Sequence, residues 1–152
     1  MGFLGNDNPT IPKVDPQAAF QMLVAGDLVG AWCFLQSADD ASAPDVLHNK
    51  ALCLRAAGRR DEALQFSRQA FRRLTEGVPQ RPFDPVGTEL IRLKSGPGPM
   101  SPVIPGCNPT YAGLQARWLY CLCLSDCGEE QEFVRISAPL EQLGLKLFEV
   151  KE

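Results

Sequence analysis

The chain has 152 residues and a formal net charge of −3, with 45% hydrophobic and 22% charged residues. This length fits one ordinary domain, so we expect a single domain over residues 1–152. The composition is that of a folded protein and excludes a chain that is disordered throughout.

Two short helices joined by a glycine are predicted over residues 15–39. Asp15 followed by Pro16 is typical of a helix start, and apolar residues then recur at helical spacing as far as Gly26. Glycine readily adopts the left-handed conformation that ends a helix, and Asp27 can cap the next one. Because the link is so short, the two helices are predicted to be antiparallel.

A second hairpin with the same layout is predicted over residues 43–76, opened by Pro44. The segment 18–38 matches the segment 50–70 at a constant interval of 32 residues. The matched pairs are Ala19 with Ala51, Met22 with Leu54, Gly26 with Gly58, Ala31 with Ala63 and Ala38 with Ala70. A repeat near this length, with small residues at fixed points, is typical of stacked helical hairpins.

The segment NKALCLRAAGRRDEALQFSRQAF resembles a tetratricopeptide repeat, which packs a first and a second helix through small residues. Ala51, Gly58, Ala63 and Ala70 stand at that family's small positions, whereas Leu54 stands where the family usually has tyrosine. The resemblance implies an all-α fold of antiparallel α-hairpin repeats that form a short right-handed superhelix. It also implies a protein-binding scaffold. A plain helical bundle is the alternative fold.

Residues 77–108 interrupt the helical pattern and are predicted to be an insertion rich in proline and glycine. Within it, the stretch that begins at Asp84 and Pro85 fits a short helix better than an edge strand. A connector packed over the helices is the expected role, and a proline-rich ligand segment is the alternative.

A third hairpin is predicted over residues 109–148. Asn108 or Pro109 starts its first helix, Gly128 ends it, and apolar residues cover nearly its whole circumference. Such a helix is expected in the middle of the fold. Pro139 is predicted to kink or divide the last helix, because proline removes a hydrogen bond and clashes with the preceding turn.

Candidate catalytic and metal-binding residues are few. His48 is the one histidine, and the sequence has no phosphate-binding loop, dinucleotide fingerprint or nucleophile elbow. Cys121 and Cys123 point to nearly opposite sides of a helix, and no cysteine or histidine pair elsewhere completes a zinc site. We therefore expect buried reduced thiols, no metal, no cofactor and no enzymatic activity.

The expected location is the cytoplasm, with no membrane partner. No run of about 18 apolar residues occurs, and the N-terminal segment lacks the basic start and apolar core of a signal peptide. Reduced thiols agree with a reducing compartment.

Residues 50–81 carry eight Lys or Arg against three Asp or Glu, a surplus of five positive charges. The surplus indicates either a surface for an acidic peptide or nucleic acid, or an ordinary solvated helix face. A nucleic-acid site needs a denser basic field with aromatic or groove-reading elements, so we do not expect nucleic acid as the partner.

In a stack of such hairpins, the first helices line the inner concave wall. The residues of the second unit that are predicted to face outward there are Asp45, His48, Asn49, Leu52 and Arg55. We expect this groove to bind a peptide or partner protein without catalysis. Asn49 matches an asparagine that clamps a partner's carboxylate in one class of the family, but Trp118 and Leu119 occupy the third unit's corresponding stretch, so the clamp is incomplete. The alternatives are a self-assembling structural subunit and an RNA-binding or regulatory helical protein, and the sequence does not set the oligomeric state.

Overall fold

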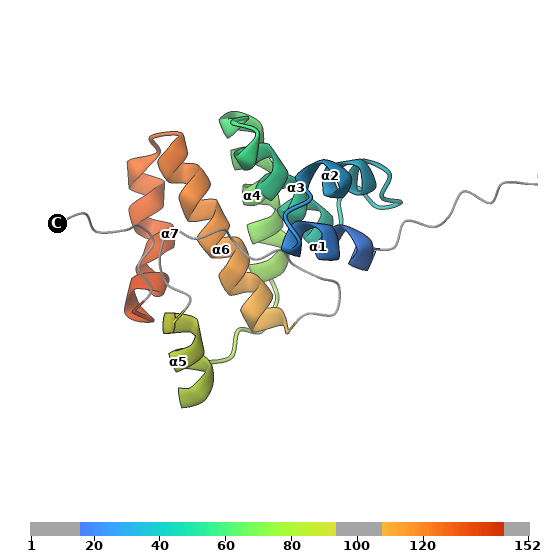
Figure 1. The fold of residues 1–152 in the computed structure, drawn as a ribbon. Helices are drawn as coiled ribbons and strands as arrows, with labels where there is room; N and C mark the ends of the chain where they lie inside the picture. The colour runs from blue at the N-terminus through green and yellow to red at the C-terminus, as the bar shows by residue number, and fades with distance from the viewer. Residues whose placement is uncertain (1–15, 94–107, 145–152) are drawn as a thin grey trace, which may run out of the picture.

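The computed structural model describes residues 16–93 and 108–144, and over these residues the protein is all-helical (Figure 1). The fold class predicted from the sequence, all-α, is confirmed at this level. The helices are α1 (Pro16–Val24), α2 (Leu28–Gln36), α3 (Pro44–Ala56), α4 (Arg60–Thr75), α5 (Pro85–Leu93), α6 (Pro109–Asp126) and α7 (Glu130–Gln142). None of the described helices is both long and apolar enough to cross a bilayer.

The three turns predicted at Gly26, Gly58 and Gly128 share one geometry. Each glycine has a positive φ, of 85°, 78° and 73° respectively, a region that side chains with a Cβ rarely adopt. In each turn the residue after the glycine donates its N–H to a carbonyl five positions back, at 2.8 to 2.9 Å. This pattern satisfies carbonyls that the end of a helix leaves open. The sequence therefore encodes the same sharp reversal three times.

The helices pack in the order of the chain, with one exception. Three pairs of consecutive helices are in contact: α1 with α2, α3 with α4, and α6 with α7. Helix α3 also touches α1 and α2, and helix α6 also touches α3 and α4. Figure 1 shows α6 between α4 and α7. The backbone of α5 stays apart from every other described helix, although its side chain Ile91 reaches the core.

The core has two parts. The larger one is formed by α3, α4, α6, α7 and Ile91, and the smaller one by Ala19, Ala31, Leu35, Val46 and Cys53 from the first three helices. Trp32 packs against both. The prediction that α6 lies in the middle of the fold is confirmed, because nearly every residue from Ala112 to Leu124 is buried.

The alanines of the repeat lie where helices come close. Ala19, Ala31, Ala51, Ala63 and Ala70 are all buried, whereas Ala38 is only partly buried. A methyl side chain allows two helix backbones to approach each other, so a larger side chain at these points would force the helices apart.

Local signals in the sequence explain the helix boundaries. Asn108 caps α6 by accepting a hydrogen bond from the Tyr111 N–H at 3.1 Å, and the short helix predicted after Asp84 is present as α5. Of the two effects predicted for Pro139, a kink or a division of the last helix, the division is wrong, because α7 continues to Gln142. Proline at this position removes one backbone N–H donor from α7, yet the helix continues for three more residues. Asp15, residues 94–107 and the predicted end of the third hairpin at residues 145–148 lie outside the described residues.

Candidate functional site

The structure corrects the predicted binding face on α3. Asp45, Leu52 and Arg55 are partly buried, but His48 and Asn49 are 0% and 1% exposed, so the prediction that these two side chains face outward is wrong. The cause is the position of α3, which touches α1, α2, α4 and α6, and its residues from Val46 to Ala51 are all buried. No side of α3 between Val46 and Ala51 is left free for a partner.

The other residues of the predicted binding face are Asp45, Leu52 and Arg55, and each is partly buried within the fold. Leu52 packs against the larger part of the core. Burial raises the pKa of the Asp45 carboxyl, which reflects a partly enclosed position. The role of these residues in binding a partner stays a prediction, and only Asp45, Leu52 and Arg55 retain any access to one.

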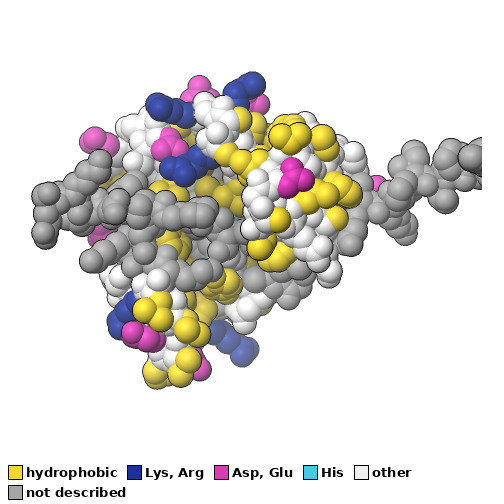
Figure 2. All heavy atoms as spheres, viewed as in Figure 1, with side chains coloured by type: hydrophobic (Ala, Val, Ile, Leu, Met, Phe, Trp, Pro, Cys, Tyr) yellow, Lys and Arg dark blue, Asp and Glu magenta, His cyan; other side chains and the backbone are white. Residues whose placement is uncertain are grey.

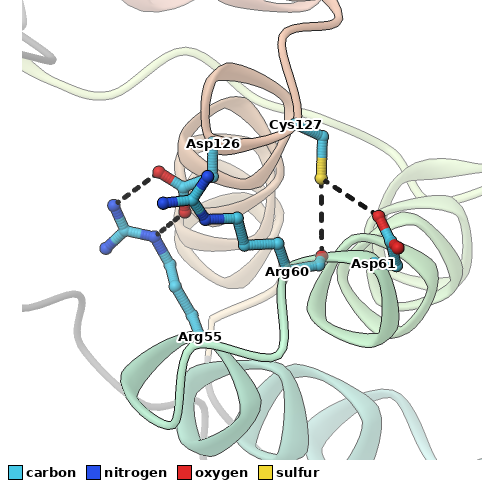
Figure 3. A network of polar contacts seen from close by, with 5 residues as sticks. All are labelled: Arg55, Arg60, Asp61, Asp126 and Cys127. Atoms are coloured by element: carbon cyan, nitrogen blue, oxygen red, sulfur yellow. Dashed lines mark hydrogen bonds and ion pairs between the residues drawn. The ribbon is translucent and has the colours of Figure 1, made fainter.

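Arg55 takes part in a polar network at the ends of three helices (Figure 3). Its Nε lies 2.6 Å from Asp126 Oδ2 and its Nη2 lies 3.3 Å from Asp126 Oδ1. Next to this pair, the Cys127 thiol donates to the Arg60 carbonyl at 3.5 Å and lies 4.0 Å from Asp61 Oδ1. The network joins the C-terminal ends of α3 and α6 to the start of α4, so Arg55 connects the second helix pair to the third.

The buried cysteines offer little reactivity. Burial raises the pKa of Cys53 and of Cys123 to about 11 and that of Cys121 to about 12, far from the range of a reactive thiolate. Within residues 16–93 and 108–144, no three His, Cys, Asp or Glu side chains are grouped as a metal site would require. Cys107 lies outside the described residues.

The basic surplus of the second hairpin is divided among internal contacts. Lys50 is buried with its Nζ 5.9 Å from the centre of the Phe66 ring, and Arg68 donates to the Tyr120 hydroxyl at 3.1 Å. Arg55 is paired with Asp126, and Arg59 is paired with Glu62. Half of the eight positive charges are thus engaged within the protein, which weakens the case for a continuous basic surface.

Helix α5 carries an apolar strip that no described helix covers. Val86, Leu90 and Leu93, here called the α5 strip, are 67%, 59% and 74% exposed. Figure 2 shows apolar side chains over α5 at the lower edge of the molecule and over the first two helices at its right. The second group includes Val24, Leu28 and Val29, which lie beside the Gly26 turn.

A cleft of about 410 Å³ lies where the end of α4, residues 80–83 and the helices α5, α6 and α7 meet. Arg81 and Arg117 line it together with threonine, glutamine and apolar side chains. Arg117 donates from Nη1 to the Ile136 carbonyl at 3.0 Å, and its guanidinium carbon is 4.9 Å from the centre of the Phe71 ring. These contacts fix Arg117 beside the cleft.

No protein-family model, curated protein or solved structure matches this chain. The candidate sites therefore rest on the geometry of the molecule alone.

Sequence reasoning missed Arg117 and did not assign a role to the α5 strip. A signal for Arg117 is present, because it is the one charged residue between Lys94 and Asp126. A charge kept within such an apolar helix indicates a special environment. The signal for the strip is the spacing of Val86, Leu90 and Leu93, which places three apolar residues on one side of a helix. The sequence does not show which segment, if any, packs against that side.

Proposed function

We propose that this chain is a protein-interaction domain that binds a partner protein through the α5 strip. The observation that carries the proposal is the exposure of three large apolar side chains on a single short helix. Isolated exposed apolar residues are ordinary on protein surfaces, whereas a contiguous row of them is typical of an interaction site.

The spacing of the strip suits a partner with an apolar groove. Val86, Leu90 and Leu93 stand at positions i, i+4 and i+7, which are the positions that a helix uses to dock into a groove. Burying one such side chain fully contributes about 1.5–3 kcal/mol. Three of them supply enough apolar contact for the centre of an interface.

Helix α5 is held in place on its other side, so the strip is presented on an ordered element. Asp84 Oδ1 caps the start of α5 by accepting from the Gly87 N–H at 2.6 Å, and Ile91 attaches the helix to the core, in which it is buried. Near the C-terminal end of the helix, Arg92 Nε donates to the Leu143 carbonyl at 3.1 Å. A binding element that is already ordered loses less entropy when the complex forms.

We also propose that the three helix pairs form tetratricopeptide-like hairpins in a short right-handed superhelix. Three supports are the common glycine turn, the buried alanines at matching positions, and the contact of each pair with the next. A location in the cytoplasm belongs to the same proposal, supported by the buried free thiols of Cys53, Cys121 and Cys123. The binding surface differs from the α3 groove expected from the sequence.

Capture of partners with matched variants tests the proposal. Val86→Asp places a charge in the strip, whereas Val134→Asp changes the same residue type at the same exposure, 67%, on α7. We expect a specific partner to be retained by the native chain and by Val134→Asp, and to be lost with Val86→Asp and with the double variant Val86→Asp/Leu90→Asp. Equal retention by all four proteins would contradict the proposal. Circular dichroism of each variant is the control for folding.

Self-assembly is distinguished by the solution mass of the same four proteins. If a second copy of the chain is the partner of the strip, the native protein and Val134→Asp have a multimeric mass and the strip variants have a monomeric one. This result would replace our proposal of a different partner protein with the structural-subunit function.

A further inference from the structure

The cleft between residues 80–83 and the helices α5, α6 and α7 has a one-sided charge. Arg81 comes from the segment before α5 and Arg117 from the middle of α6. Among the described residues that line the cleft, none carries a carboxylate. Arg81 is exposed at this open recess of about 410 Å³ and Arg117 is partly buried beside it, so together they favour an anion there.

Arg117 is half-buried and lacks a counterion among the described residues. Its Nη1 is used by the Ile136 carbonyl, while Nε and Nη2 make no hydrogen bond or ion pair to any residue that the structure describes. Burial lowers its pKa, and the nearby charge of Arg135 acts in the same direction. A guanidinium in this situation gains from an anion, since the anion replaces the hydration that burial removed.

The rest of the cleft offers both a further donor and an apolar wall. Thr110 Oγ1 accepts the Arg81 N–H at 3.1 Å, which leaves the hydroxyl hydrogen free to donate to a ligand. Phe83 and Leu114 line the apolar side, and Phe83 is fixed by an edge-to-face contact with Tyr111 at 6.5 Å. The recess therefore combines charge recognition with a surface for an apolar group.

We propose that this cleft binds an organic carboxylate that bears an apolar group. The carboxylate lies on Arg117 and Arg81, and the apolar group lies against Phe83 and Leu114. The planar fork of a guanidinium matches the two oxygens of a carboxylate, which favours this anion over a spherical one. The ligand is either a free small acid or the terminal carboxylate of a peptide, since both present the same chemistry.

Titration of the isotope-labelled full chain with probe ligands, followed by NMR, tests this site. The probes are 4-phenylbutyrate, its neutral amide, the tripeptide acetyl-Ala-Ala-Phe with a free carboxylate, and inorganic phosphate. We expect saturable shifts around residues 75–93 and 110–117 with at least one carboxylate. The amide is expected to bind about tenfold more weakly, because it lacks the charge. Shifts with both carboxylates indicate a free-acid site that also admits a chain terminus, whereas shifts with the tripeptide alone identify the terminus as the ligand.

Two variants and one control connect the binding to the arginines. Arg117→Gln is expected to weaken the bound carboxylate about tenfold. Arg81→Gln is expected to weaken it as well without disturbing the fold, because the bond to Thr110 uses the Arg81 backbone. Arg72→Gln changes an exposed arginine outside the cleft and leaves the affinity unchanged. The proposal is overturned if no probe gives a saturable shift, if phosphate binds as tightly as the better carboxylate probe, or if the variant that carries both Arg81→Gln and Arg117→Gln keeps full affinity for that probe. It is also overturned if phenylbutyrate binds and its neutral amide binds equally well.

Discussion

The ion pair between Arg55 and Asp126 is predicted to stabilise the contact between the second and third helix pairs. It has two short contacts, at 2.6 and 3.3 Å, and its side chains are 37% and 28% exposed. Fully exposed pairs contribute about 0.2–1 kcal/mol, while hydrogen bonds to charged groups in more buried positions contribute about 1.5–3 kcal/mol. The partial exposure places this pair between the two cases, so we expect a coupling energy of about 1 kcal/mol.

A double-mutant cycle measures this coupling. The four proteins are the native chain, Arg55→Met, Asp126→Asn and the double variant, and the free energy of unfolding comes from urea titration followed by circular dichroism. The pair Arg59 with Glu62 is the control, since it lies on the surface of α4 with both side chains more exposed. The control is expected to couple by less than about 0.5 kcal/mol. A coupling within about 0.3 kcal/mol of zero would refute the prediction that Arg55 and Asp126 stabilise the contact between the second and third helix pairs.

Three further predictions concern the core. Ala70 is fully buried, so Ala70→Glu is expected to lower the free energy of unfolding, measured by urea titration, by more than about 3 kcal/mol. The control Ala138→Glu, at an exposed position on α7, is expected to change it little. A small loss in both variants would show that Ala70 is not at a helix contact. The Oε1 atom of Gln115 is buried and has no hydrogen-bond partner within the described structure. Gln115→Met is expected to raise the melting temperature, because it removes the cost of burying an unpaired carbonyl oxygen, about 1–3 kcal/mol. A lower melting temperature would contradict this. Because burial raises the pKa of Cys53 and Cys123 to about 11, only about 0.1% of either thiol is ionised at pH 8. Iodoacetamide is therefore expected to modify the exposed Cys33 first, as followed by mass spectrometry. Equal rates of modification at Cys33, Cys53 and Cys123 would show that the two buried thiols are accessible.

Local features of the fold could be predicted because they depend on neighbours in the sequence. A glycine followed by a polar residue was enough to place the turns at Gly26, Gly58 and Gly128, and Asn108 before Pro109 was enough to start α6. The short helix α5 was also expected from its spacing. Each of these signals acts within about one helical turn, where the physics is that of capping and backbone conformation.

Which face of a helix is covered could not be predicted, because that depends on segments far apart in the chain. His48 and Asn49 are polar, and polar residues usually face solvent, yet α3 is enclosed by four other helices. Arg55 meets Asp126, which is 71 positions away, and no local pattern indicates such a pairing. The cleft beside Arg117 likewise forms from five separate segments.

Site-specific photo-crosslinking shows directly whether a partner protein lies on the α5 strip. A photoreactive phenylalanine analogue placed at Val86 samples the strip, and the same analogue at Val134 samples an equally exposed position on α7. After irradiation in the native cell, we expect a discrete crosslinked protein from position 86 and none from position 134. Crosslinks of equal yield and identity from both positions, or none from position 86, would contradict it.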